Sequence, residues 1–182
     1  IIDFVTKTSV NDVLYIVDRI KRILANRRHK VMIVDDSAPT RHMVAKLLAN
    51  QMFQVIQATD GEDALNKLDH DPDTRVVITD YNMPGINGVD LTLEIRRHYH
   101  KDELAIIAIS GEDDELISSQ FLKMGATDFI KEPFSSEEFY CRINNTIEML
   151  DLIETVTHMQ NRDFLTGAYN RRYFYHLTDR IL

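Results

Sequence analysis

Three aspartates are the residues most suited to chemistry, because each directly follows a short apolar run. Asp35 and Asp36 follow the run at 31–34, and Asp80 follows the run at 75–79. Ionised carboxylates held together repel each other, so they need a cation, or one of them acquires a raised pKa. A hard ion such as Mg²⁺ prefers carboxylate oxygens and water as ligands. A carboxylate beside such a metal can attack phosphorus and form an acyl phosphate. The sequence therefore predicts a site for Mg²⁺ or Mn²⁺ with phosphoryl chemistry.

The elements that would position these aspartates alternate between strand and helix. Short apolar runs predict five strands, at 31–34, 53–58, 75–79, 104–109 and 129–130. Apolar residues at helical spacing follow each of the five runs. This alternation predicts an α/β fold, a doubly wound parallel sheet with helices on both faces. Ligands bind outside the carboxyl ends of strands in such sheets. We therefore expect these residues to share one edge: Asp35, Asp36, Asp80, Ser110 and Glu132.

Four segments together resemble the receiver domains of two-component response regulators. They are VMIVDDS (31–37), VITDYNMPGING (77–88), IIAIS (106–110) and GATDFIKEPF (125–134). The resemblance covers about 105 residues without gaps and implies a flavodoxin-like sheet of strand order 2-1-3-4-5. It also implies phosphorylation by a sensor histidine kinase or a phosphotransfer protein in a phosphorelay.

The resemblance assigns a role to each matching position. Asp80 matches the phosphoacceptor, and Asp35 and Asp36 match the acidic pair, with Asp36 as the more direct metal ligand. Asn82 lies where the family offers a backbone carbonyl to the metal. Ser110 matches the switch hydroxyl. Phe129 matches the aromatic switch position.

One position departs from the family, which places a lysine directly before the proline of the fifth strand. This sequence has Glu132 there, and Lys131 comes one residue early. An offset of one residue in a strand points a side chain to the opposite face. We therefore expect Lys131 to point away from the site. Two readings stay open: a phosphorylated receiver, or a phosphorylation-impaired pseudo-receiver that serves as a dimerisation module.

Both ends of the sequence predict elements outside the receiver, which we place at 30–147. Met149, Leu152, Val156 and Met159 repeat at coiled-coil spacing, which predicts a helical stalk at 148–162 and a homodimer through it. Residues 163–182 resemble the opening of a GGDEF diguanylate cyclase domain, on the match of RDFLTGAYNRRYF to RDxLTGxxNRRxF. The catalytic parts of that family are absent from this fragment, so we expect no catalytic residue here and cyclic di-GMP synthesis only in a longer parent protein.

Residues 1–29 form either a linker helix or the tail of a preceding receiver-like domain. Asp3-Phe4-Val5 followed by an amphipathic helix resembles the fifth strand and last helix of such a domain.

Composition limits the classes of function. The net charge of -8 argues against a general nucleic-acid surface, and no apolar run is long enough to cross a membrane. Cys141 is the only cysteine, which fits a reducing cytoplasm, and we expect it to be a packing residue. The histidines show no metal-ligand spacing, so we expect them on the surface. An aspartyl phosphatase is a further possibility, but Asn82 occupies the place of its second acid.

Overall fold

The computed structural model describes residues 10–111 and 115–161. The strands are β1 (Lys30–Val34), β2 (Gln54–Ala58), β3 (Thr74–Asp80), β4 (Ala105–Ser110) and β5 (Asp128–Lys131). The helices are α1 (Val10–Ala25), the 3₁₀ turn η1 (Asn26–Arg28), α2 (Ala38–Asn50), α3 (Gly61–His70), α4 (Gly88–His98), α5 (Glu115–Met124) and α6 (Ser136–Asn161). Each predicted strand is present, with ends that differ by at most one residue, and a helix follows each strand as predicted.

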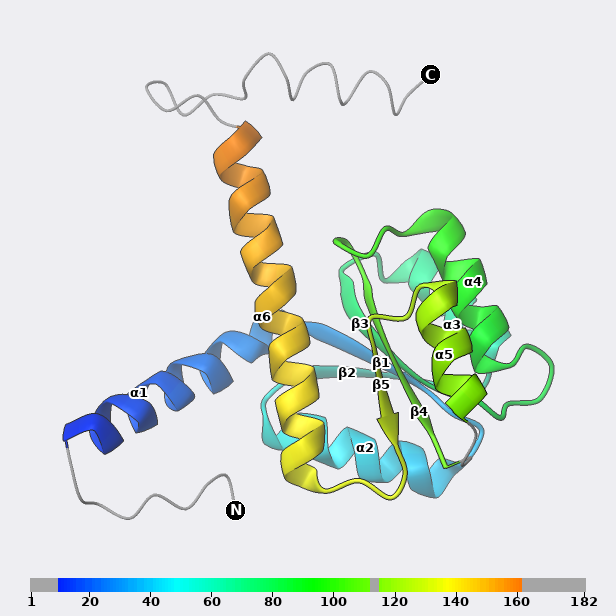
Figure 1. Cartoon of the computed structure of the whole chain (residues 1–182), viewed down its shortest axis with the longest axis horizontal. Helices are drawn as coiled ribbons and strands as arrows, with labels where there is room; N and C mark the ends of the chain where they lie inside the picture. The colour runs from blue at the N-terminus through cyan, green and yellow to red at the C-terminus, as the bar shows by residue number, and fades with distance from the viewer. Residues whose placement is uncertain (1–9, 112–114, 162–182) are drawn as a thin grey trace.

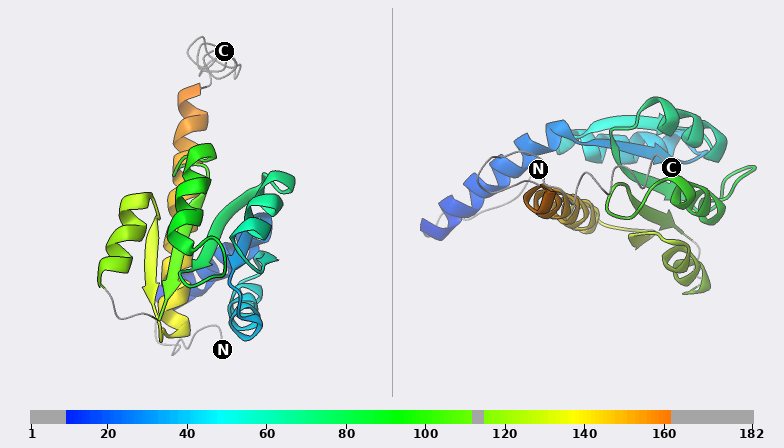
Figure 2. Two further views of the ribbon diagram at one scale, coloured as in Figure 1. Left: turned by 90° about the vertical axis from the view of Figure 1, so that its right-hand side faces the viewer. Right: turned by 90° about the horizontal axis from the view of Figure 1, so that it is seen from above.

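The five strands form one parallel sheet in the order β2-β1-β3-β4-β5, which confirms the predicted fold and strand order. Alternate residues of β1 point to opposite faces. Val31 and Ile33 pack under α2 and α6, and Met32 and Val34 pack under α3, α4 and α5. Helices therefore cover both faces of the sheet, as Figure 2 shows.

Side-chain caps fix where the helices at the carboxyl edge begin. The Ser37 hydroxyl accepts a hydrogen bond from the backbone N–H of Thr40, and the Asn87 side chain accepts one from Asp90. Ser37 comes directly after Asp35 and Asp36, so its cap starts α2 beside the acidic pair. The turn out of β1 is therefore short, and it holds both aspartates at the edge of the sheet.

Helix α6 is continuous from the receiver into the segment predicted as a stalk. Its sheet-facing residues as far as Leu150 are buried, among them Phe139, Ile143 and Ile147. Its second half extends beyond the sheet, and Met149, Leu152, Val156 and Met159 are exposed there (Figure 1). The predicted receiver-like strand before α1 and the GGDEF-like segment lie outside the described residues.

Two expectations about side-chain burial are wrong. Cys141 is exposed on α6 instead of packed, because it lies on the face of that helix away from the sheet. His29 is buried instead of on the surface, because the start of β1 lies against α6. Within the described residues no helix is both long and apolar enough to cross a membrane.

Candidate functional site

The carboxyl ends of β1 and β3 bring the predicted aspartates to one edge. Asp35 follows β1 and is buried, Asp36 beside it is exposed, and Asp80 closes β3 and is half-buried. Asp35 Oδ1 accepts a hydrogen bond from the backbone N–H of Ser37 at 2.6 Å. Asp80 Oδ2 accepts one from the backbone N–H of Asn82 at 3.1 Å. Backbone amides thus orient both carboxylates and leave acceptor capacity on each.

Burial and mutual repulsion make these carboxylates harder to ionise than free ones. Burial raises the pKa of Asp80 to about 6, and the charges of Asp35 and Glu132 add to this shift. Burial also raises the pKa of Asp35, with further contributions from Asp36 and Glu132. Without a bound cation, Asp80 is consequently mostly ionised only above about pH 6.

Glu132 faces the acidic edge, at the position where the family carries lysine. Its backbone N–H donates to the carbonyl of Ser110 at 2.9 Å. Its Oε2 lies 3.4 Å from the place where a Cβ on Gly111 would stand. Its charge adds to the raised pKa of both Asp35 and Asp80, after the larger effect of burial. Lys131, in contrast, is exposed. The end of β5 therefore adds a negative charge to this edge.

The two residues expected to act as switches lie next to the acidic edge. Ser110 is buried at the end of β4, and Phe129 is half-buried in β5. The ring of Phe129 lies 6.1 Å from that of Phe121, which lies 6.1 Å from that of Tyr81, one residue after Asp80. An aromatic row thus connects the turn after β3 to β5.

Gly88, the first residue of α4, allows that helix to lie close to the end of β3. A Cβ at Gly88 would stand 2.1 Å from the Asp80 carbonyl oxygen and 2.9 Å from Cζ of Phe121. The Gly88 N–H donates to the carbonyl of Tyr81 at 3.0 Å. Only glycine lets the start of α4 lie this near the end of β3. The sequence Asn87-Gly88 predicts a turn, but it does not predict how closely α4 approaches the end of β3 here.

The donor set suits a hard divalent cation that keeps most of its waters. Within residues 10–111 and 115–161, no three His, Cys, Asp or Glu side chains lie close enough to form a complete metal-binding group. Mg²⁺ needs only one or two protein carboxylates, with water as its other ligands. Asp36 is exposed beside Asp35, and the repulsion between Asp35 and Asp80 is one that a cation would relieve. These residues therefore fit Mg²⁺.

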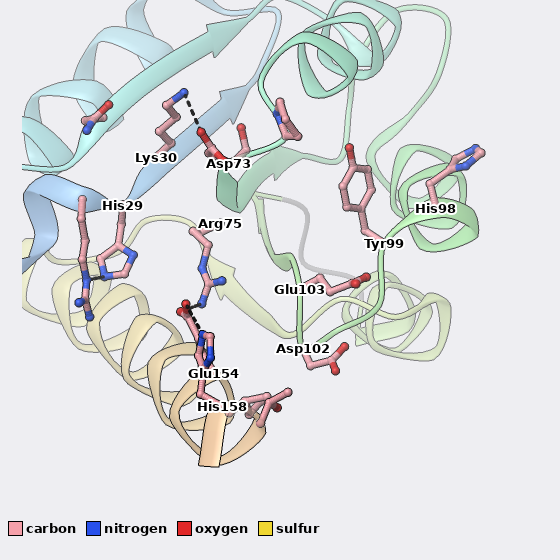
Figure 3. A pocket seen from close by; sticks show the side chains of 16 residues that line it. His29, Lys30, Asp73, Arg75, His98, Tyr99, Asp102, Glu103, Glu154 and His158 are labelled. Atoms are coloured by element: carbon pink, nitrogen blue, oxygen red, sulfur yellow. Dashed lines mark hydrogen bonds and ion pairs between the residues drawn. The ribbon is translucent and has the colours of Figure 1, made fainter. Parts of the chain in front are cut away.

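A second group of charged residues, which sequence reasoning missed, lies at the opposite edge of the sheet. A cavity of about 890 Å³ opens there between the strand starts and α6 (Figure 3). Arg75 of β3 pairs with Glu154 of α6 at 3.3 Å. Asp151 of α6 pairs with Arg28 at 2.7 Å and lies 3.4 Å from His29 Nε2. These ion pairs fasten α6 to the body, and no local sequence pattern reveals them.

Comparisons with known proteins identify the fold family. The sequence profile of the response regulator receiver domain matches residues 31–144. The chain is similar to chemotaxis protein CheY1 of Helicobacter pylori (strain ATCC 700392 / 26695), with 36% identity over 109 residues, 59% of this chain and 88% of that protein. It is also similar to the phosphate regulon transcriptional regulatory protein PhoB of Escherichia coli (strain K12), with 28% identity over 72% of this chain and 58% of that protein.

One solved structure extends the likeness beyond the receiver segment. It is a two-component system response regulator/GGDEF domain protein, with 38% identity and a TM-score of 0.77. The match covers 83% of this chain and 62% of that one. The match to the receiver profile covers more than half of the 182 residues, and the sheet has the same order as the family's. The chain therefore belongs to the family of response regulator receiver domains.

Proposed function

We propose that this receiver accepts a phosphoryl group on Asp80 from a histidine kinase or phosphotransfer protein. The observation that carries the proposal is the position of Asp80, half-buried at the end of β3 beside Asp35, with its pKa raised to about 6. The ionised Asp80 carboxylate attacks the phosphorus of a phosphohistidine. A P–O bond to Asp80 forms, the P–N bond breaks, and the imidazole leaves.

Three other groups serve this transfer. Asp36 and Asp80 would hold Mg²⁺ directly with the Asn82 carbonyl, and Asp35 would hold it through a bound water. The ion would neutralise charge on the phosphoryl oxygens. The Ser110 hydroxyl would donate a hydrogen bond to a phosphoryl oxygen from the end of β4. Phe129 would change its packing in response, because it adjoins Phe121 in the aromatic row.

The test is phosphorylation with acetyl phosphate and Mg²⁺, followed by intact mass. We expect one added phosphate on the wild-type chain and none on Asp80→Asn or without Mg²⁺. Asp102→Asn, a change at an exposed position on the opposite edge, serves as the matched control and should be phosphorylated like the wild type. An unmodified wild-type chain would reject the proposal and support a phosphate-independent dimerisation module, in which Glu132 keeps the site from accepting phosphate.

The same proposal includes a diguanylate cyclase output and a homodimer through α6. The likeness to a response regulator/GGDEF structure supports the output, together with the motif at 162–174. The exposed apolar residues in the second half of α6 support the dimer. A GTP-to-cyclic-di-GMP assay on a parent protein that carries the complete output domain tests the first part. No cyclic di-GMP from that protein would reject it.

A further inference from the structure

Helix α1 projects from the body (Figures 1 and 2), and apolar side chains along it are exposed to solvent. The side chains concerned are Val13, Val17, Ile20 and Leu24, with exposed fractions of 50%, 41%, 52% and 49%. Isolated helices of this length are marginal in water, and most helical stability in proteins comes from packing an apolar face. We therefore expect another protein surface to cover these four side chains, which we call the α1 stripe.

The buried side of α6 shows what covers a stripe of this spacing. The α1 stripe advances by steps of four, three and four residues. The same steps on α6 are made by Phe139, Ile143, Thr146 and Leu150, with exposed fractions of 0%, 0%, 4% and 0%. On α6 Phe139, Ile143 and Leu150 lie in the core that contains β1, β3, β4 and β5, and Thr146 is a buried polar residue beside them. The α1 stripe thus has the pattern of a helix that covers a parallel sheet.

Two positions beside the stripe differ in residue type from their counterparts on α6. Ile16 aligns with Arg142, which is exposed on α6. Lys21 aligns with the buried Ile147, and its long stem can run along apolar surface while its ammonium stays in water. The sequence Asp3-Phe4-Val5 before α1 resembles Asp128-Phe129-Ile130 before α6, although the stretch between this motif and the stripe is one residue shorter before α1. The likeness therefore extends from the helix to the residues that precede it.

We infer that α1 is the last helix of a second receiver-type α/β unit, and that an open sheet face of that unit covers the α1 stripe. A second copy of this receiver offers no such face. Among the described residues, one face of its sheet is already covered by α2 and α6 and the other by α3, α4 and α5. The covering sheet belongs to residues encoded before α1.

The second unit would lie against the base of the stalk. Arg22 of α1 pairs with Glu148 of α6, and Arg28 of η1 pairs with Asp151 at 2.7 Å. Ile23 of α1 is buried against the body. These contacts hold α1 at a fixed place beside α6, so a domain docked on the stripe would contact the region where α6 leaves the receiver.

Hydrogen exchange of α1 tests this inference. It is measured in the 182-residue chain and in the natural gene product that carries the residues encoded before Ile1. We expect the amides of residues 13–24 to exchange at least about tenfold more slowly in the longer protein. Ile20→Glu should abolish this protection in the longer protein and leave the exchange of residues 139–150 unchanged. Ile16→Glu, beside the stripe, is the matched control and should keep it.

Two results would overturn the inference. The first is equal exchange of α1 in both proteins, because no sheet would then cover the stripe. The second is protection of α1 in the 182-residue chain that rises with protein concentration and disappears in Ile20→Glu together with a change from dimer to monomer. That result would make a second copy of the chain the partner of α1.

Discussion

Glu132 and Asp80 face the same acidic edge, and the charge of Glu132 makes Asp80 harder to ionise. Burial is the largest cause of the raised Asp80 pKa, and the charges of Asp35 and then Glu132 add to it. The family carries a lysine at the position of Glu132, whereas Lys131 here is exposed. The side chain that follows β5 thus adds a negative charge where receivers of the family add a positive one. Four acidic residues, Asp35, Asp36, Asp80 and Glu132, therefore contribute negative charge to this site, and the Arg41 guanidinium opposes the raised pKa of Asp35.

We expect Asp80→Asn to raise the free energy of unfolding at about pH 7.5 without divalent metal, by about 1 to 3 kcal/mol. The folded-state pKa of Asp80 is raised from 3.8 to about 6. A raised folded-state pKa stabilises the fold while the carboxyl is protonated, and this stability is lost as the pH rises through about 6. The advantage of the Asn variant should therefore disappear near pH 4.

Urea denaturation in EDTA between about pH 4 and pH 8 measures this difference. Asp102→Asn, on the opposite edge, is the control and should change stability little at either pH. Equal stability of Asp80→Asn and the wild type at about pH 7.5 would contradict the expected cost of ionised Asp80.

Glu132 should increase the affinity of the site for Mg²⁺. We expect Glu132→Gln to weaken Mg²⁺ binding about threefold to tenfold, and Glu132→Lys to weaken it further, because each step removes attraction for a cation. The rise in melting temperature with MgCl₂ concentration reports the affinity, because a ligand that binds only the folded state stabilises it. Glu138→Gln, a change at an exposed position at the start of α6, is the control. Unchanged affinity in Glu132→Lys would show that Glu132 does not act on the metal.

Gly88→Ala should destabilise the fold far more than Gly85→Ala. A Cβ at Gly88 would overlap the Asp80 carbonyl and the Phe121 ring, so β3 and α4 would have to separate. A Cβ at Gly85 meets no atom within 4 Å, and the cost there comes only from its φ of +80°. We expect losses of about 3 kcal/mol or more and about 1 kcal/mol respectively, measured by urea denaturation. Similar losses at both positions would contradict this account.

The sequence predicted the sheet and the residues at its carboxyl edge because both follow from local patterns. Apolar runs mark strands, and the rule for doubly wound sheets places the strand ends together. Counting residues along the fifth strand predicted that Glu132 would lie at the acidic edge. In the structure, the charge of Glu132 adds to the raised pKa of Asp80.

The burial of His29 could not be predicted in the same way. His29 stands in a basic segment that resembles a solvated linker, and it is buried because α6 returns to the start of β1. The pairs Arg75–Glu154 and Arg28–Asp151 join elements far apart in the sequence. Periodicity reports which face of an element is apolar, but it does not report which other element packs on it. The contacts at the amino ends of the strands could therefore be identified only from the structure.

His29 should make the fold less stable in mild acid. Burial lowers its pKa, and the nearby cations Arg28 and Arg75 lower it further, while Asp151 opposes them. A lowered folded-state pKa means that stability is present above the ordinary value of 6.5 and is lost as the pH falls through the folded-state value. We expect the free energy of unfolding to fall more steeply between about pH 7 and pH 5 in the wild type than in His29→Gln.

Thermal or urea denaturation at a series of pH values measures the slopes. His100→Gln changes an exposed histidine and should keep the slope of the wild type. Parallel slopes for the wild type and His29→Gln would show that His29 stays neutral, or is tolerated as a cation, throughout this range.

The second half of α6 should join two copies of the chain. Leu152 and Val156 are 64% and 44% exposed, at the spacing of a coiled-coil seam with Met149 and Met159. We expect the pair of changes Leu152→Glu and Val156→Glu to convert a dimer to a monomer in light scattering, because it places charges at the buried seam. The fold should survive, since both side chains lie beyond the sheet. Thr157→Glu, off the seam and exposed, should leave the dimer intact. A wild-type monomer at high micromolar concentration, or a dimer that survives both glutamates, would remove α6 as the dimer contact.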